Sequence, residues 1–266
     1  MIFRQLFDPE TATYTYLLAD ETTREAVLVD TVLEQLERDS TLLRELDLEL
    51  VYTLETHVHA DHVTASGKLR ETLGSKVGVG ARAGVENADR ALEDGECVDF
   101  GSCRVETLHT PGHTEGCVTY VCSAEGLALT GDALLIRGCG RTDFQQGDAK
   151  TLFRSVRDRI LSLADETLLY PGHDYRGRTV TTVAEEKRFN PRLGLDRSEA
   201  EFAEIMNGLK LAYPKRMDRA VPANLVSGLL PPSARDLEEE ARERDSVADR
   251  MAGLRQDAEL WGGMGI

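Results

Sequence analysis

The chain has 266 residues, of which 41% are hydrophobic, and it carries a formal net charge of −16 at pH 7. This length suffices for one buried core, so the sequence does not require a second domain. The negative charge excludes general binding to nucleic acids and to anionic membranes, because like charges repel. The apolar runs are too short to predict a membrane-spanning helix, and residues 1–10 lack the basic flank and apolar segment of an export signal.

The five cysteines are an odd number and contain no Cys-x-x-Cys pair. This spacing is not typical of a disulfide framework or of a zinc site built from thiolates. Reduced thiols are the remaining interpretation, and they fit a reducing compartment. We therefore expect the protein to be cytoplasmic.

The first third of the chain alternates strands with helices. Residues 14–19 and 25–30 are β-rich and are separated by a polar turn, which predicts a hairpin. Leucines at helical spacing over residues 33–46 predict one helix or two short ones. Residues 48–54 are a further predicted strand, and residues 63–73 are a predicted helix that ends before a glycine.

Later in the chain the pattern changes to short strands and turns, followed by helices. An aspartate begins a predicted helix over residues 148–163, a buried strand follows at 167–170, and residues 198–211 have apolar side chains at helical spacing. This order is typical of two sheets packed face to face with helices outside. The predicted short strands cover residues 76–79, 96–100, 103–109, 117–122 and 127–130.

Side chains that bind metals are concentrated in residues 56–62, which read Thr-His-Val-His-Ala-Asp-His and follow a predicted strand. Histidine is the commonest metal ligand, so this loop predicts a metal site. Three later loops each follow a strand and offer one more ligand beside a glycine: His113, Asp132 and His173. Glycine lets the backbone turn sharply and approach a neighbour closely, so we expect the four loops to converge.

Together these motifs, Thr-His-x-His-x-Asp-His, Pro-Gly-His-Thr, Thr-Gly-Asp and Pro-Gly-His, resemble the ligand series of the metallo-β-lactamase superfamily. Residues 136–147, which include Arg-Thr-Asp-Phe-Gln-Gln-Gly, resemble the persulfide dioxygenases of that superfamily, also called sulfur dioxygenases. The similarity covers residues 1–225. It implies an α+β fold, a four-layer αββα sandwich of the metallo-β-lactamase type.

The resemblance implies an iron(II)-dependent dioxygenase of sulfur metabolism and hydrogen sulfide detoxification. Its partners would be O2 and a low-molecular-weight thiol persulfide, such as glutathione persulfide, and its products sulfite and free thiol. One Fe(II) per chain would be held by His57, His113 and Asp132, a set that leaves positions open for substrates. The side chains implied to orient these ligands through hydrogen bonds are His59, Asp61, His62 and His173.

For the substrate, Arg141 is the expected carboxylate clamp, because a guanidinium offers paired donors. An ordinary surface ion pair is the alternative for this arginine. The resemblance also places Tyr175 near the substrate. Cys139, in the same loop as Arg141, is expected to be a buried small residue rather than a nucleophile, since no histidine base is adjacent to it.

The residues alone leave a two-metal site open, in which Asp132 bridges the ions. Such a site activates water for hydrolysis, as in the glyoxalase II relatives that cleave thioesters of glutathione. A non-catalytic metal-binding module is a third hypothesis. The similarity of residues 136–147 favours the dioxygenase. In the two-metal hypothesis the first ion is bound by His57, His59 and His113, and the second by Asp61, His62 and His173.

The C-terminal segment, residues 231–266, is dense in opposed charges and departs from the family pattern. It predicts a solvated helix, with a contact between copies in a homo-oligomer as the alternative. The predicted organisation is therefore a metallo-β-lactamase-like catalytic domain at residues 1–230, including its C-terminal helices, and a charged helical extension at residues 231–266.

Overall fold

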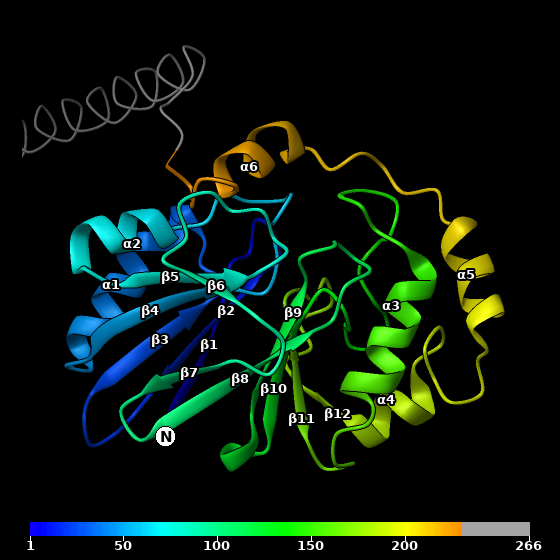
Figure 1. Cartoon of the computed structure of the whole chain (residues 1–266), viewed down its shortest axis with the longest axis horizontal. Helices are drawn as coiled ribbons and strands as arrows, with labels where there is room; N and C mark the ends of the chain where they lie inside the picture. The colour runs from blue at the N-terminus through cyan, green and yellow to red at the C-terminus, as the bar shows by residue number, and fades with distance from the viewer. Residues whose placement is uncertain (230–266) are drawn as a thin grey trace, which may run out of the picture. The chain divides into compact units, whose positions relative to one another are not determined.

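Two six-stranded sheets form the centre of the computed structural model, which describes residues 1–229 (Figure 1). The predicted extension at residues 231–266 lies outside the described residues. In spatial order the first sheet contains β1 (Ile2–Phe7), β2 (Tyr14–Ala19), β3 (Glu25–Val29), β4 (Glu49–Glu55), β5 (Lys76–Gly80) and β6 (Arg90–Leu92). The second contains β12 (Thr181–Thr182), β11 (Leu168–Pro171), β10 (Leu127–Gly131), β9 (Val118–Cys122), β8 (Cys103–His109) and β7 (Cys97–Phe100).

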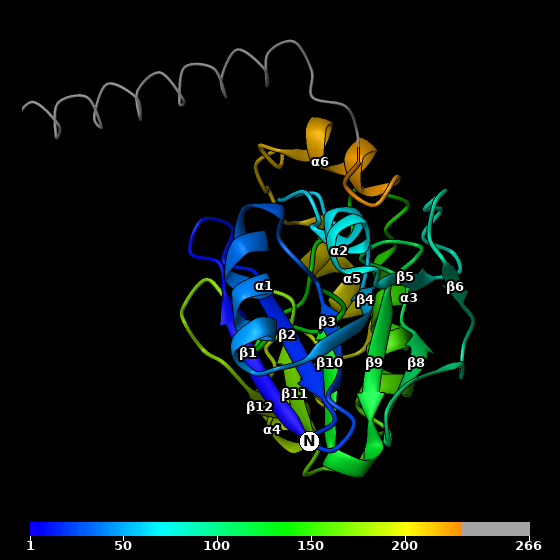
Figure 2. The ribbon, with the colours of Figure 1, turned by 90° about the vertical axis from the view of Figure 1, so that its left-hand side faces the viewer.

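Helices cover the outer face of each sheet (Figures 1 and 2). The first sheet carries α1 (Leu36–Glu45) and α2 (Ser66–Leu73), and the second carries α3 (Ala149–Ser155), α4 (Val183–Phe189) and α5 (Glu199–Asn207). α6 (Met217–Asn224) lies at one end of the sheets in both views. None of the helices within residues 1–229 has the length and apolar character needed to cross a membrane.

Alternate residues of one strand supply different cores, because successive side chains of a strand point to opposite faces. In β2, Tyr16 and Leu18 pack between the two sheets, whereas Leu17 packs under α1 and α2. In β10, Leu129 lies between the sheets and Ala128 packs against α3 and its neighbours. Both faces of both sheets are therefore buried, and the predicted four-layer αββα architecture is confirmed.

Some element boundaries differ from the sequence predictions. The predicted cap at Asp148 is confirmed, since its carboxylate accepts from Thr151 N at 2.7 Å, but α3 ends at Ser155 and a π-helical turn follows. α5 ends at Asn207, because Asn and Gly are poor helix formers. The C-terminal helices expected before residue 230 include α6, whose bounds were not predicted and which contains Pro222, a residue that usually interrupts helices.

The predicted ligand loops follow β4, β8, β10 and β11 and meet at one end of the two sheets. Val118 N donates to Thr56 O at 2.8 Å, and Gly172 N donates to Gly131 O at 2.8 Å. These close approaches need glycine: Gly131 has φ +50°, and a Cβ there would lie 2.5 Å from Thr56 Oγ1. Backbone hydrogen bonds and close packing at glycine therefore bring the loops together, in addition to the interactions of the metal-ligand side chains.

Gly112, which precedes a predicted ligand, tests this dependence on close packing. It has φ +129°, and a Cβ would overlap the backbone of Leu152 in α3. We expect Gly112→Ala to lower the free energy of unfolding in urea by about 3 kcal/mol, from backbone strain plus overpacking. The matched control is Gly126→Ala, at φ +63° with open space around it, for which backbone strain alone predicts about 1 kcal/mol. Equal losses in the two variants would contradict the packing argument.

Candidate metal centre

All seven predicted metal-site residues come together in the structure, and they form two adjacent groups. Within each group the potential ligand atoms lie within 4.8 Å of one another. The groups are joined by a hydrogen bond of 2.7 Å between Nδ1 of His173 and Oδ1 of Asp132. The first group is His57, His113 and Asp132, and the second is His59, Asp61, His62 and His173.

The His57 ring is oriented by Thr56, whose hydroxyl oxygen lies 2.9 Å from His57 Nδ1. That hydroxyl donates its own proton to Asp30 Oδ2 at 2.9 Å, so it accepts the proton of His57 Nδ1. The lone pair of His57 is then on Nε2. Burial, with the adjacent His59 and His113, lowers the pKa of His57 well below its ordinary value. A neutral imidazole with a free Nε2 is the form that binds metal ions.

The His113 ring is oriented in the same way by the backbone. Its Nδ1 lies 2.6 Å from the carbonyl oxygen of Arg141, which accepts only, so Nδ1 carries the proton. The other nitrogen, Nε2, faces Oδ2 of Asp132 at 3.8 Å. In their neutral forms the two histidines of the first group therefore present Nε2 lone pairs beside a carboxylate oxygen of Asp132, a donor set that fits a metal ion.

The second group is arranged differently, because its histidines already have protein partners. His173 lies between Asp132 and Asp61, with Nε2 at 3.0 Å from Asp61 Oδ2. Burial opposes protonation, but these two carboxylates outweigh it and raise the pKa of His173 well above its ordinary value. His62 Nε2 lies 3.2 Å from the carbonyl oxygen of Thr31. These nitrogens are engaged in hydrogen bonds within the protein.

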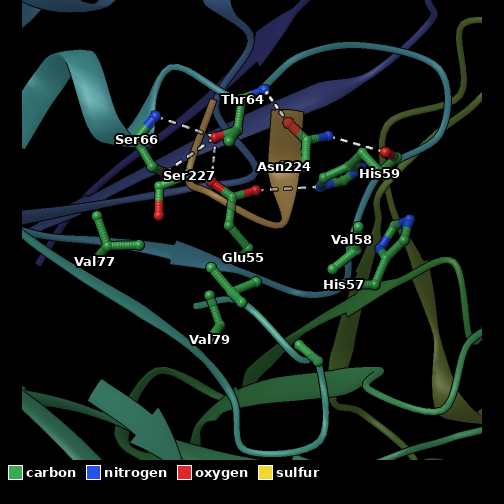
Figure 3. Close-up of a pocket in the computed structure, with 12 residues that line it drawn as sticks. Glu55, His57, Val58, His59, Thr64, Ser66, Val77, Val79, Asn224 and Ser227 are labelled. Atoms are coloured by element: carbon green, nitrogen blue, oxygen red, sulfur yellow. Dashed lines mark hydrogen bonds and ion pairs between the residues drawn. The ribbon is translucent and has the colours of Figure 1, made fainter. Parts of the chain in front are cut away.

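His59 is held by two buried carboxylates. Its Nε2 lies 3.2 Å from Asp30 Oδ1 and 3.3 Å from Glu55 Oε2, and Figure 3 shows Glu55 pointing toward the ring. Although burial opposes it, these charges raise the pKa of His59 to about 10. Glu55 is fixed in turn by the hydroxyls of Thr64 and Ser66, at 2.6 and 2.5 Å. The ring therefore takes part in a buried ion network.

Asn224 of α6 holds the backbone of the histidine loop (Figure 3). Its amide nitrogen donates to the carbonyl oxygens of His59 and His62, each at 2.9 Å, and its oxygen accepts from Thr64 N at 2.8 Å. No role was predicted for this residue, for Asp30 or for Thr56. Asp30 could have been found, since it ends an apolar strand with a charge that must be buried.

A cleft of about 680 Å³ opens beside the first group, and both predicted substrate residues line it. Tyr175 is 75% exposed, and its ring stacks on His173 with centroids 6.1 Å apart. The Arg141 guanidinium lines the cleft but is already paired with Asp143, through Nε at 2.6 Å and Nη2 at 2.8 Å. Both predicted residues therefore line the cleft, and Arg141 also forms the ion pair that was the alternative expected for it.

The chain matches the family model described as the Metallo-beta-lactamase superfamily over residues 8–173. It therefore belongs to this superfamily, and the fold with its His and Asp groups indicates a metal-binding site.

Human mitochondrial persulfide dioxygenase ETHE1 is 52% identical over 234 residues, which cover 88% of this chain and 91% of the human protein. The crystal structure of ETHE1 from Myxococcus xanthus has a TM-score of 0.83 and 52% identity, over 86% of this chain and 100% of that one. The chain is thus an enzyme of the persulfide dioxygenase family, as the resemblance predicted. The hydroxyacylglutathione hydrolase GloC of Haemophilus influenzae is more distant, with 36% identity over 57% of this chain and 79% of that protein.

Cys139 lines the cleft but is only 7% exposed, and burial raises the pKa of its thiol to about 11. We expect iodoacetamide at pH 7.5 to alkylate it about 100-fold more slowly than an unshifted thiol, because the thiolate is the reactive form. Cys97, which is partly exposed, is the internal control. Mass spectrometry of native and urea-unfolded samples measures both rates. Rapid labelling of Cys139 in the native protein would show that it is a reactive thiol.

Proposed function

We propose that the protein is an iron(II)-dependent persulfide dioxygenase that converts a low-molecular-weight thiol persulfide, O2 and water into sulfite and the free thiol. For a persulfide RSSH the reaction balances as RSSH + O2 + H2O giving RSH + H2SO3. The observation that carries the proposal is the 52% identity to a persulfide dioxygenase over 88% of the chain. Glutathione persulfide or an equivalent is the proposed substrate, with a role in hydrogen sulfide detoxification.

His57, His113 and Asp132 would hold the iron. Two imidazole nitrogens and one carboxylate are the donor set of non-haem iron(II) oxygenases, in which ligand positions stay open for substrates. Bound there, iron(II) would supply the electron density that activates dioxygen toward the terminal persulfide sulfur. The tautomers that Thr56 and the Arg141 carbonyl impose support this assignment.

We propose one iron per chain, because side chains of the second group form hydrogen bonds that orient the ligands of the first group. His173 binds Oδ1 of Asp132 at 2.7 Å, so that Oδ2 remains directed toward His113. Asp61 anchors the other nitrogen of His173. His62 is bound to protein oxygens through both ring nitrogens and His59 through Nε2 alone, which supports a role in positioning rather than ligation.

The substrate residues remain Arg141 and Tyr175. The exposed Tyr175 ring lies over His173 at the side of the cleft and offers an apolar face with a hydroxyl. Arg141 has N–H groups beyond those that donate to Asp143 and to the Ala212 carbonyl oxygen, and these can donate to a substrate carboxylate.

We also propose a reducing compartment, the cytoplasm, which is supported by the five free thiols. The human relative is mitochondrial by name, and a reducing organelle would satisfy the same observation.

The main test measures metal content and oxygen uptake on one anaerobically purified sample. We expect about one iron per chain and persulfide-dependent uptake of O2. Asp132→Ala should lose the iron and reduce uptake at least about 1,000-fold, because it removes a ligand. His62→Gln is the comparison, since in a one-iron site it removes no ligand and should weaken iron binding far less than Asp132→Ala. Two metal ions per chain, with hydrolysis of S-lactoylglutathione and no oxygen uptake, would instead identify a glyoxalase II-like hydrolase.

Thr56→Val tests the hydrogen bond that orients His57. We expect the affinity for iron(II) to fall about 10- to 100-fold, because outer partners of a ligand have effects of this size. Thr56→Ser keeps the hydroxyl and should retain the affinity of the unchanged protein. Competition with a chromophoric chelator measures both. If valine and serine weaken binding equally, the methyl group and not the hydroxyl matters, and the assignment of Thr56 is wrong.

A further inference from the structure

Among the described residues, one lysine and two arginines line the cleft beside the first group, and both arginines already have counter-ions. Arg141 pairs with Asp143 at 2.6 Å, and Arg216 pairs with Glu10. The third, Lys215, is exposed and forms no hydrogen bond or ion pair with any residue in the range 1–229. Within this range, Lys215 carries the uncompensated positive charge of the cleft.

The segment that carries Lys215 is fixed against the metal side of the cleft. It runs between α5 and α6, and its Ala212 carbonyl accepts from Arg141 Nη1 at 2.8 Å. The Tyr213 ring packs edge-on against Phe144, with centroids 5.5 Å apart. Pro214 restricts the backbone just before the lysine. These contacts hold Lys215 at the exposed border of a cleft whose inner wall contains His57.

The unpaired charge of Lys215 is what makes this residue important for substrate binding. The chain carries a net charge of −16, so an anionic substrate is repelled at long range. A guanidinium already paired with a carboxylate adds little net positive field, whereas an unpaired ammonium attracts anions over about one Debye length. The lysine ammonium is a point charge on a flexible side chain, so it can adjust its position to that of a carboxylate.

We propose that Lys215 binds a carboxylate of the thiol portion of the substrate at the border of the cleft, while the persulfide sulfur points toward the group of His57, His113 and Asp132. The residue thereby selects carboxylate-bearing thiol carriers over neutral ones. The proposal deepens the proposed function and rests on it for the persulfide chemistry, although carboxylate binding itself is measurable without turnover.

The kinetic test compares two persulfides with the iron-loaded enzyme. For glutathione persulfide, which carries carboxylates, Lys215→Met should raise KM about tenfold and leave kcat within about twofold, because the ion pair contributes to binding and not to the chemistry. For neutral 2-hydroxyethyl persulfide the same variant should change KM less than about twofold. Lys215→Arg should restore the KM for glutathione persulfide. Lys210→Met is the matched control, since Lys210 is in the same segment but does not line the cleft.

Calorimetric titration with glutathione itself provides a readout without turnover. The dissociation constant should rise about tenfold in Lys215→Met, and added salt should weaken binding to the unchanged protein more than to the variant. Unchanged glutathione affinity, or an equal rise in KM for both persulfides, overturns the proposal. If the unchanged enzyme consumes no oxygen with any persulfide but binds glutathione through Lys215, the proposed function fails and the carboxylate site stands.

Discussion

The buried carboxylate of Asp30 is the constraint from which the geometry of the metal centre follows. It is 1% exposed, and a buried charge without partners is very unfavourable, so the histidine loop must bring donors to it. Thr56 supplies its backbone N–H at 2.7 Å and its hydroxyl at 2.9 Å, and His59 supplies a ring nitrogen at 3.2 Å. Satisfying this one carboxylate sets the conformation of the loop and, through Thr56, the orientation of His57.

Two opposite electrostatic environments lie side by side in this centre. His57 is surrounded by other imidazoles and stays neutral, whereas His173 lies between carboxylates and favours the protonated form. The hydrogen bonds differ between the two groups: His57 and His113 each use only Nδ1, whereas His62 and His173 use both ring nitrogens and His59 uses Nε2. The same ligand series can thus be used in different ways in one superfamily, according to the partners that surround it.

Much of this arrangement was predictable from the sequence, since four short motifs with glycine at the turns indicated the convergence of seven ligand-type residues. The partners of those residues were not predictable. Asn224 reaches the loop from about 160 positions away, and α6 forms despite Pro222 because tertiary contacts outweigh local propensity. For Arg141, the spacing to Asp143 does permit a local ion pair, but only the fold shows that Arg141 lines the cleft while it is paired in this way. The hydrogen bonds of these partners depend on three-dimensional packing, which the local sequence does not specify.

The hydrogen bond from His113 to the carbonyl oxygen of Arg141 separates two properties that share one loop. Every amino acid has the same backbone carbonyl, so the orientation of His113 does not depend on which side chain stands at position 141. The side chain at that position is free to vary with the molecule that enters the cleft. With the proposed role of Arg141 in substrate binding, a substitution at this position would change the thiol carrier recognised and leave the orientation of the His113 imidazole unchanged.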